Sequence, residues 1–523
     1  MLTRSSRRIR CLLTEAIEIH GGSTSMNCPG NRATAQACYE TSASTMKHFF
    51  EYFAICKILN DSGIRKIKGC SAISIFFAYF MLPFLGQNIF TITTTCKEYF
   101  IIKKDSIYNF LNSHTFGWRN FLFNLSKKII EYFNSVAKKT RDAKRNKHKP
   151  LLSKTRPKCL VLDDTCMYKE RSRFLENYAR KLWDHALQVH FKGYLIVMAL
   201  FTDGISQIPV DFALTATSNK KNIDTTYEKK YHFNSNGYKR REDAKKSKID
   251  VVKEMIQRLS KRKFKFDFVL MDSWYGVPIL ISYIYKFYHV ICNIKLNGFK
   301  YKYKNDLLGV NEIYKKEKAK NQRKSMFSCL IQVENKSYLK GEKKYIDAKI
   351  VFLRKRDSKE YMAILSTNTN LCDKDIVRAY AYRWDIEVFF RTSKQFLRLD
   401  NGTQSCNFDA LIASITIACT RYCFLSYVQR RDEDPMTHGA LFQACCDELP
   451  EITFEQAIEQ VLNITFKALA MASKSQENDA RELVKQLESL VYSLKCNKLK
   501  KVFNCEVAKL GIPVGEPQPS VAA

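Results

Sequence analysis

The sequence lacks the motifs that mark several common protein classes. Its 18 cysteines include no Cys-x2-Cys pair, and neither Cys445-Cys446 nor Cys419 with Cys423 has a set of partner ligands, so we expect no zinc site. We interpret the cysteines as small buried hydrophobes in a reducing compartment. A Ser-His-Asp set, a Walker loop and a dinucleotide fingerprint are also absent, which argues against serine hydrolases and nucleotide-binding enzymes.

A membrane-spanning segment is not evident either. The first 25 residues carry four arginines but no adequate apolar run, so we do not expect a signal peptide. The stretch between Lys68 and Lys97 has no charged residue. Its most apolar part, 73–86, is broken at Pro83 and Gly86, whereas a membrane helix needs about 20 apolar residues. We interpret 73–86 as the buried core of a helical domain and expect no membrane partner; a membrane segment is the weaker alternative.

Acidic residues are scarce beside basic ones. Lys and Arg total 86 and Asp and Glu total 52, which gives a net charge of +34. A soluble protein with this excess has a polyanionic partner or a very basic surface, and nucleic acid is the partner we expect. The basic stretch 138–158 predicts a linker that contacts DNA phosphates, with an ordinary solvated linker as the alternative.

Three acidic residues stand where metal ligands are expected. Asp164 ends the apolar run Cys159–Leu162, and Asp272 ends the run Phe268–Met271. Glu387 lies in a segment with helical spacing. Carboxylates at two strand ends and on a helix can hold a pair of divalent ions, which at a separation of about 3.5–4 Å activate an attacking oxygen and stabilise the leaving oxygen of a phosphodiester.

Each of these candidates has an alternative. Asp163 precedes Asp164, and the two-residue period of a strand points their side chains to opposite faces. Asp385 competes with Glu387 on the same predicted helix. Asp164 and Asp272 could also serve only to cap a turn or a helix, which is a common structural role.

The segment 380–394 is the most specific motif in the chain. Its polar positions are Tyr380, Arg383, Glu387 and Lys394. Their spacings of 3, 4 and 7 residues, at about 100° per residue, predict one helix with all four side chains on one face. Such a face offers one metal ligand, two cations and a phenol; ordinary surface charges are the alternative.

In these residues and their spacing, the sequence resembles a DDE transposase of a bacterial insertion sequence. The resemblance is to the subgroup named for its Tyr-x2-Arg-x3-Glu-x6-Lys signature, and the match at 380–394 is complete in type and spacing. The Asp163-Asp164-Thr165 context resembles the family's Asp-Thr pattern and favours Asp164 as the first ligand. The resemblance covers residues 150–430 well, 46–150 loosely and 1–45 not at all.

The resemblance implies a catalytic cofactor and a reaction. Asp164, Asp272 and Glu387 would be the catalytic residues and would bind two Mg²⁺ ions, for which Mn²⁺ could substitute because both metals prefer carboxylate oxygens. The enzyme would bind the inverted repeats of its element, cleave at the element ends and join them to target DNA. A hairpin intermediate is an option within the family.

The resemblance also implies partners and DNA contacts. Tyr380 and Arg383 would hold the phosphate near the transposon end, and Lys394 would hold the DNA backbone. The partners would be double-stranded DNA and a second copy of the chain in a synaptic homodimer. The protein would act in the bacterial cytoplasm, on the nucleoid.

The pattern from residue 159 onward predicts an α/β fold. The expected elements are strands at 159–163, 191–201 and 208–214, a helix at 249–262, a strand at 266–271, a helix near 277–286 and a strand at 289–295. This order is that of an RNase H-like catalytic core, with a β-rich insertion at 296–370. Apolar runs at 328–333, 349–354 and 361–366 are its expected strands.

The expected division of the chain follows from these segments and from about two to four domains for this length. It comprises 1–45 as disordered or a mis-assigned start, 46–137 as a helical DNA-binding domain, 138–158 as the basic linker, 159–295 and 371–430 as the RNase H-like core, 296–370 as the insertion, and 431–523 as a helical region with a disordered tail. Helices are expected at 46–59, 73–85 and 105–112, the last capped by Asp105, and an apolar stripe predicts another at 483–494.

Three other functions are compatible with the sequence. One is a DNA-binding protein without activity, either a decayed copy or a repressor of transposition. Another is a membrane-associated basic protein, suggested by the uncharged stretch 69–96. The third is a two-metal nuclease that cleaves DNA without joining it.

Overall fold

The computed structural model describes residues 42–95, 102–143, 156–322, 324–336, 344–354, 360–432, 436–446 and 503. The chain divides into two compact units. The first unit comprises 1–45, 84–101 and 443–523, and its described part contains helix α5 (Ile89–Thr95). The second unit comprises 46–83 and 102–442 and contains every described strand. The expectations for 1–41 and for the helix at 483–494 lie outside the described residues.

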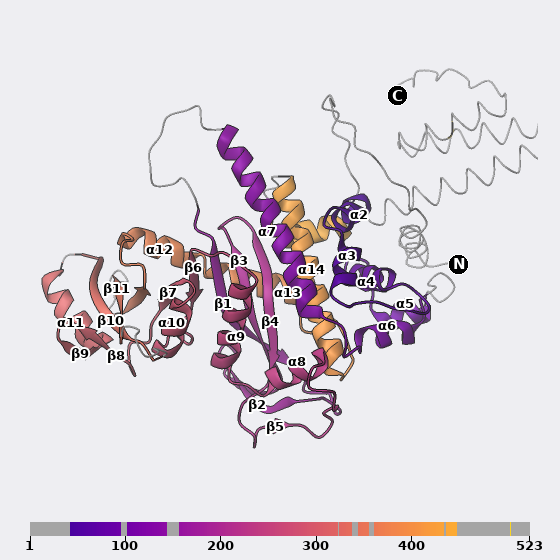
Figure 1. Ribbon diagram of the computed structural model, residues 1–523, viewed down its shortest axis with the longest axis horizontal. Helices are drawn as coiled ribbons and strands as arrows, with labels where there is room; N and C mark the ends of the chain where they lie inside the picture. Colours follow the sequence, from indigo (N-terminus) through magenta and orange to yellow (C-terminus); the bar gives the residue numbers. More distant parts are fainter. Residues whose placement is uncertain are drawn as a thin grey trace, which may run out of the picture. The chain divides into compact units, whose positions relative to one another are not determined.

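The centre of the second unit is a large mixed sheet (Figure 1). Strand β1 (Cys159–Tyr168) pairs antiparallel with β3 (Val189–Thr202), which pairs antiparallel with β4 (Gln207–Thr215). On its other side β1 runs parallel to β6 (Phe268–Met271), and β6 runs parallel to β7 (His289–Asn293). The five predicted strands are therefore present, in the spatial order β4-β3-β1-β6-β7.

The sheet continues beyond β7 into residues 300–366. Strand β12 (Tyr361–Ser366) pairs antiparallel with β7 and carries β11 (Tyr345–Arg354) on its other edge. Strands β10 (Met326–Glu334), β8 (Lys300–Tyr303) and β9 (Asp306–Gly309) follow in that order. The three apolar runs predicted as strands in this segment correspond to β10, β11 and β12, and they extend the central sheet itself.

The structure also contains elements that the sequence pattern does not predict. Among them are β2 (Tyr178–Asp184), β5 (Ile223–Asp224), α8 (Asn236–Ala244) and α11 (Val310–Lys320). Helix α8 lacks an apolar stripe because Arg240 and Arg241 occupy its buried face and ion pairs satisfy them there. A polar sequence of this kind gives no periodic hydrophobic signal.

Helices cover the sheet on both sides. Ser247 caps helix α9 (Lys248–Lys261), and its side chain accepts a hydrogen bond from the backbone N–H of Asp250. Helix α10 (Pro278–Tyr285) begins with a proline at its first position. These two helices pack together. Helices α12 (Asp373–Ala381) and α13 (Trp384–Gln395) follow the last strand, and α13 packs on β1.

Two apolar helices lie inside the second unit. Among the described helices, α14 (Phe408–Arg431) is the one long and apolar enough to cross a membrane, and 94% of its apolar window is buried within the protein. Helix α4 (Ala72–Met81) is buried along its whole length, as predicted for a core segment. Arg421 of α14 joins the two by donating to the carbonyl oxygens of Tyr79 (2.6 Å) and Phe80 (2.9 Å).

The N-terminal helices differ from their predicted boundaries. The helix expected at 46–59 is interrupted at Ala54, whose φ of 51° ends α2 (Ser42–Tyr52) before α3 (Ile55–Asp61). Asp105 lies in the first turn of α6 (Lys104–Leu111), and Lys103, not Asp105, occupies the cap position. Helix α7 (Trp118–Ala143) runs into the segment expected to be a linker and packs beside α14 (Figure 1).

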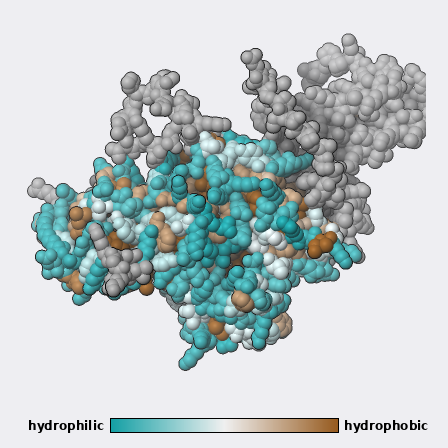
Figure 2. All heavy atoms as spheres, viewed as in Figure 1, coloured by the Kyte–Doolittle hydropathy of each residue, from teal (hydrophilic) through white to brown (hydrophobic). Residues whose placement is uncertain are grey.

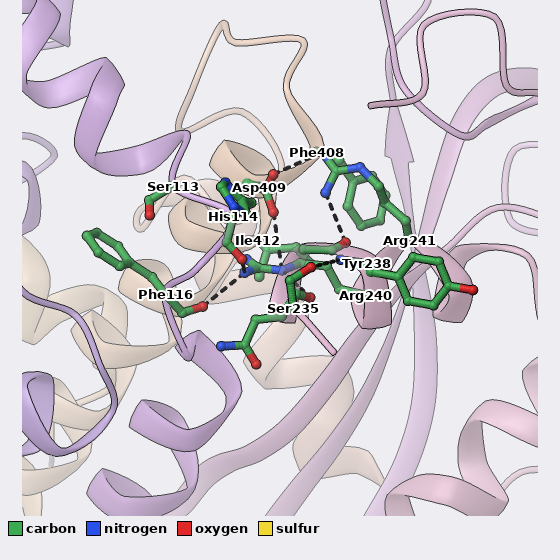
Figure 3. A network of polar contacts seen from close by, with 12 residues as sticks. Ser113, His114, Phe116, Ser235, Tyr238, Arg240, Arg241, Phe408, Asp409 and Ile412 are labelled. Atoms are coloured by element: carbon green, nitrogen blue, oxygen red, sulfur yellow. Dashed lines mark hydrogen bonds and ion pairs between the residues drawn. The ribbon is translucent and has the colours of Figure 1, made fainter. Parts of the chain in front are cut away.

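A network of buried ion pairs includes the first turn of α14 (Figure 3). Arg241 donates to Glu176 at 2.7 Å and to Asp409 at 2.9 Å, and all three side chains are almost fully buried. Arg240 also contacts Asp409, at 3.2 Å, and donates to the carbonyl oxygen of Phe116 at 2.9 Å. The network joins α8, α14, the segment before β2 and the turn before α7, so it fixes the helices that surround the sheet.

The face of the molecule in Figure 2 is mostly hydrophilic, with scattered apolar side chains between the polar ones. Scattered apolar residues are normal on a protein surface and indicate no particular partner.

Candidate active site

Two aspartates lie side by side where the parallel pairing of β1 with β6 ends. In the β1–β6 pair Leu162 is in register with Met271, and Asp163 and Asp272 each follow by one residue. Residues in register on parallel strands point to the same face, so this pair is adjacent at the carboxyl end of the sheet. Open α/β sheets bind their ligands at the carboxyl ends of their strands.

The turn after β6 fixes the orientation of Asp272. Its Oδ1 accepts hydrogen bonds from the backbone N–H groups of Trp274 (3.0 Å) and Tyr275 (3.1 Å), which leaves Oδ2 available to a ligand. Gly276 closes the turn against β7, because a Cβ there would lie 2.2 Å from the carbonyl oxygen of Asn293. The carboxylate is therefore held by the backbone that follows it.

Asp163 and Asp164 face opposite sides of β1. Asp164 accepts hydrogen bonds from the Tyr275 hydroxyl (2.6 Å) and from Lys248 at the start of α9 (2.8 Å). Asp163 instead lies 3.5 Å from a guanidinium nitrogen of Arg383, which precedes α13. The structure thus brings Asp163 to the side where α13 lies, and it places Asp164 against a lysine on the other side.

The predicted single helix over 380–394 is wrong. Helix α12 ends at Ala381 and α13 begins at Trp384. Between them the N–H groups of Tyr382 and Arg383 bond to carbonyls three residues earlier, at 3.2 and 2.9 Å, so the chain makes a tighter turn than an α-helix. Gly204 supports this turn from the β3–β4 connection, where a Cβ would come within 2.5 Å of the Tyr382 ring.

Arg383 connects two carboxylates from distant parts of the chain. Its guanidinium lies 2.5 Å from Oε1 of Glu387 and 3.5 Å from Oδ2 of Asp163. These contacts raise the pKa of Arg383 despite its partial burial. Glu387 and Asp163 are therefore linked by their contacts with the same arginine.

Asp385 has a different role from Glu387. Its carboxylate accepts a hydrogen bond from the Thr202 hydroxyl at 2.5 Å, and burial raises the pKa of Asp385. This contact ties the first turn of α13 to the end of β3 and positions the helix. Of the two acidic residues, Glu387 is the one directed toward Arg383.

The other two motif residues lie in different places. Tyr380 interacts electrostatically with Arg383, Asp272 and Asp163, and burial raises the pKa of its phenol. Lys394 lies farther along β1, where its ammonium donates to the carbonyl oxygen of Cys166 at 2.6 Å. Tyr380, Arg383 and Glu387 thus gather near Asp163, whereas Lys394 does not share their position.

The donor chemistry of this site suits a divalent metal. Burial and the neighbouring carboxylates of Asp272 and Asp164 raise the pKa of Asp163 to about 7, because negative charge is crowded there. Carboxylate oxygens are the ligands that Mg²⁺ and Mn²⁺ prefer. No three acidic, histidine or cysteine side chains in the described segments already stand in a metal-binding group. Glu387 would have to leave Arg383 to complete one with Asp163 and Asp272.

The comparison with protein families decides the class. Residues 154–421 match the model of the transposase DDE domain, which covers just over half of the chain. The chain belongs to this transposase family. The matched range of the transposase includes β1, β6, α12 and α13, and with them every residue of the candidate site. A search of curated proteins finds no match.

The family match confirms the predicted resemblance at the level of a DDE transposase, and the mixed α/β sheet with its covering helices fits such a domain. A transposase acts on DNA, which agrees with the net charge of +34. The Tyr-Arg-Glu-Lys subgroup, the insertion-sequence origin and the roles of individual site residues stay predictions.

Proposed function

We propose that this protein is the transposase of a bacterial insertion sequence. It binds the inverted repeats as double-stranded DNA, cleaves at the element ends and joins them to target DNA. The observation that carries the proposal is the adjacency of Asp163 and Asp272 at the point where the parallel pairing of β1 with β6 ends, with Glu387 linked to Asp163 through Arg383. Family membership supports the class of reaction.

The catalytic core is of the RNase H-like kind. Support comes from the strand order β4-β3-β1-β6-β7, in which β4, β3 and β1 are antiparallel and β1, β6 and β7 are parallel. Residues 296–370 form the β-rich insertion, which adds strands to the edge beyond β7. We assign residues 159–295 and 371–430 to this core.

We assign the first catalytic carboxylate to Asp163 in place of Asp164. Asp163 is in line with Asp272, whereas Asp164 is already engaged by Lys248 and Tyr275 on the opposite side of the strand. Asp164 then serves to hold the α9 side of the sheet end.

The side chains of the site divide the work of phosphodiester chemistry. Asp163, Asp272 and Glu387 would hold two Mg²⁺ ions, which would supply activation of the attacking oxygen and stabilisation of the leaving oxygen. Arg383 binds the phosphate near the transposon end through its forked N–H groups, and Tyr380 donates to the same phosphate. Asp163 must be ionised to bind a cation, so a pH above its pKa of about 7 favours binding.

The remaining parts of the chain have proposed roles in DNA binding and assembly. Residues 46–137 contact DNA as helices, although α4 and α7 pack within the same compact unit as the core. Residues 138–158 and Lys394 contact the phosphate backbone. The protein works as a homodimer when two element ends are paired, and it acts in the cytoplasm on the nucleoid.

Cleavage of the protein's own element ends tests the proposed function. Purified protein and Mg²⁺ are incubated with DNA ending in the repeats that flank its gene, alongside the Glu387→Gln variant. Metal-dependent cuts and strand transfer by the wild type are expected, with binding but no cuts by the variant. Binding without cutting by either protein would favour the inactive DNA-binding alternative, and cutting without transfer would favour a nuclease.

A further inference from the structure

One cation occupies the centre of the candidate site. Arg383 lies 2.5 Å from Glu387 and 3.5 Å from Asp163, so a single guanidinium connects β1 with α13. The three side chains are partly shielded, with exposed fractions of 18% for Arg383, 19% for Asp163 and 33% for Glu387. Charges in such a place are screened less than charges in open water.

The two lysines near the site contact other groups. Lys248 bonds to Asp164 on the far side of β1, and its ammonium also lies 3.7 Å from the centre of the Trp274 ring. Lys394 bonds to the carbonyl oxygen of Cys166 and lies 3.9 Å from Asp400. Within the described residues, Arg383 is thus the cation that contacts Asp163 and Glu387.

A divalent ion and the Arg383 guanidinium would compete for the carboxylate oxygens of Asp163 and Glu387. A metal bound by Asp163 and Glu387 would lie within a few ångströms of Arg383, where two positive charges repel strongly in a partly buried site. Both carboxylates would also have to give up their charge-assisted contacts with the arginine. Metal binding therefore needs the arginine to turn away.

The side chain of Arg383 is accessible from solvent. The residue belongs to the turn between α12 and α13, and 18% of its side chain is exposed. A DNA phosphate that approaches from this side offers two oxygens in the geometry that a guanidinium binds best. The phosphate would thus exchange one partner of Arg383 for another.

We infer that Arg383 keeps metal affinity low until a DNA phosphate draws it away from Asp163 and Glu387. This inference rests on the proposed function, because it concerns the metal site of that reaction. It couples substrate to cofactor: DNA tightens metal binding, and by thermodynamic linkage metal tightens DNA binding by the same factor. The free protein thereby binds the metal weakly, and the DNA-bound protein binds it more tightly.

Mn²⁺ binding to the full-length protein tests the inference directly. Calorimetry, or the loss of the free-ion signal in electron paramagnetic resonance, gives the dissociation constant without DNA for the wild type, Arg383→Gln and Arg383→Lys. Removal of the positive charge is expected to tighten Mn²⁺ binding on the order of tenfold, the effect of about 1.4 kcal/mol. The lysine variant keeps the charge and should bind more nearly as the wild type does.

A matched control separates this effect from a general change of charge. Arg378 on α12 is 76% exposed and contacts Asp375 at 3.6 Å, so Arg378→Gln removes the same charge from a position outside the site. It should leave Mn²⁺ affinity unchanged. Addition of DNA carrying the element end should tighten Mn²⁺ binding by the wild type and by Arg378→Gln, but not by Arg383→Gln.

The outcomes distinguish the inference from the function beneath it. Equal or weaker Mn²⁺ binding by Arg383→Gln, in a wild type that cuts its element ends, would overturn the inference alone. An absence of both Mn²⁺ binding and cutting in the wild type would overturn the proposed function as well. Equal tightening by Arg378→Gln would also overturn the inference, because it would reduce the effect to net charge.

Discussion

The loss of Arg241 should destabilise the second unit strongly. In Arg241→Met, Glu176 loses an ion pair of 2.7 Å and Asp409 loses one of 2.9 Å. The side chain of Asp409 is fully buried and that of Glu176 nearly so, and water cannot replace the missing charge. Removal of one partner from a buried ion network typically costs about 3–5 kcal/mol.

The remaining contacts place the expected loss near the lower end of that range. Asp409 keeps Arg240 at 3.2 Å, and Glu176 keeps the backbone N–H groups of Lys229 (3.2 Å) and Phe408 (3.3 Å). We therefore expect a loss of about 3 kcal/mol in the free energy of unfolding. Because Arg241 anchors the start of α14, the variant should also expose that helix earlier on heating.

Urea unfolding monitored by tryptophan fluorescence measures the loss. The matched control is Arg180→Met, which removes an arginine that is 57% exposed and pairs with Asp224 at 3.3 Å. An exposed pair of this kind contributes at most about 1 kcal/mol. If Arg241→Met shifted the unfolding midpoint no more than Arg180→Met does, the buried network would not have the stabilising role described for it.

Two further predictions concern pH and DNA binding. Burial lowers the pKa of His438 from 6.5 to about 4, so on acidification the unfolded state binds a proton before the folded state does. The free energy of unfolding should therefore fall by about 3 kcal/mol as the pH drops from 6.5 to 4. In acid unfolding curves, His438→Gln should remove this pH dependence. Lys394→Ala should weaken binding to the element ends. It should also make the slope of log affinity against log salt concentration shallower, by the amount that one phosphate contact contributes. An unchanged slope would count against that contact.

The core of the fold is predictable because its signals are local. Each predicted strand of the core is a short apolar run, and the helix α9 repeats its apolar positions at helical spacing. Helix α8 is missed because ion pairs, and not apolar side chains, bury it, and its partners Glu176 and Asp409 are far away in sequence. A prediction from one segment at a time has no access to such pairings.

The candidate site is only partly predictable for the same reason. Helical spacing continues through the motif, so the break at Tyr382 cannot be predicted from that spacing. Gly204 in the β3–β4 turn packs against the break although it is 178 residues away in sequence (382 − 204). Asp163 did carry a local signal, since it and Asp272 each directly follow a four-residue apolar run. The family pattern instead favoured Asp164, and strand register is what distinguishes the two.

We propose that Asp163, Asp272 and Glu387 form the catalytic set of this DNA transposase. The most direct test compares Asp163→Asn with Asp164→Asn in Mg²⁺-dependent cleavage of DNA carrying the element ends, with binding to the same DNA measured in parallel. We expect Asp163→Asn to bind and not cut, and Asp164→Asn to retain cleavage. Loss of cleavage in Asp164→Asn alone, with Asp163→Asn still active, would contradict the assignment.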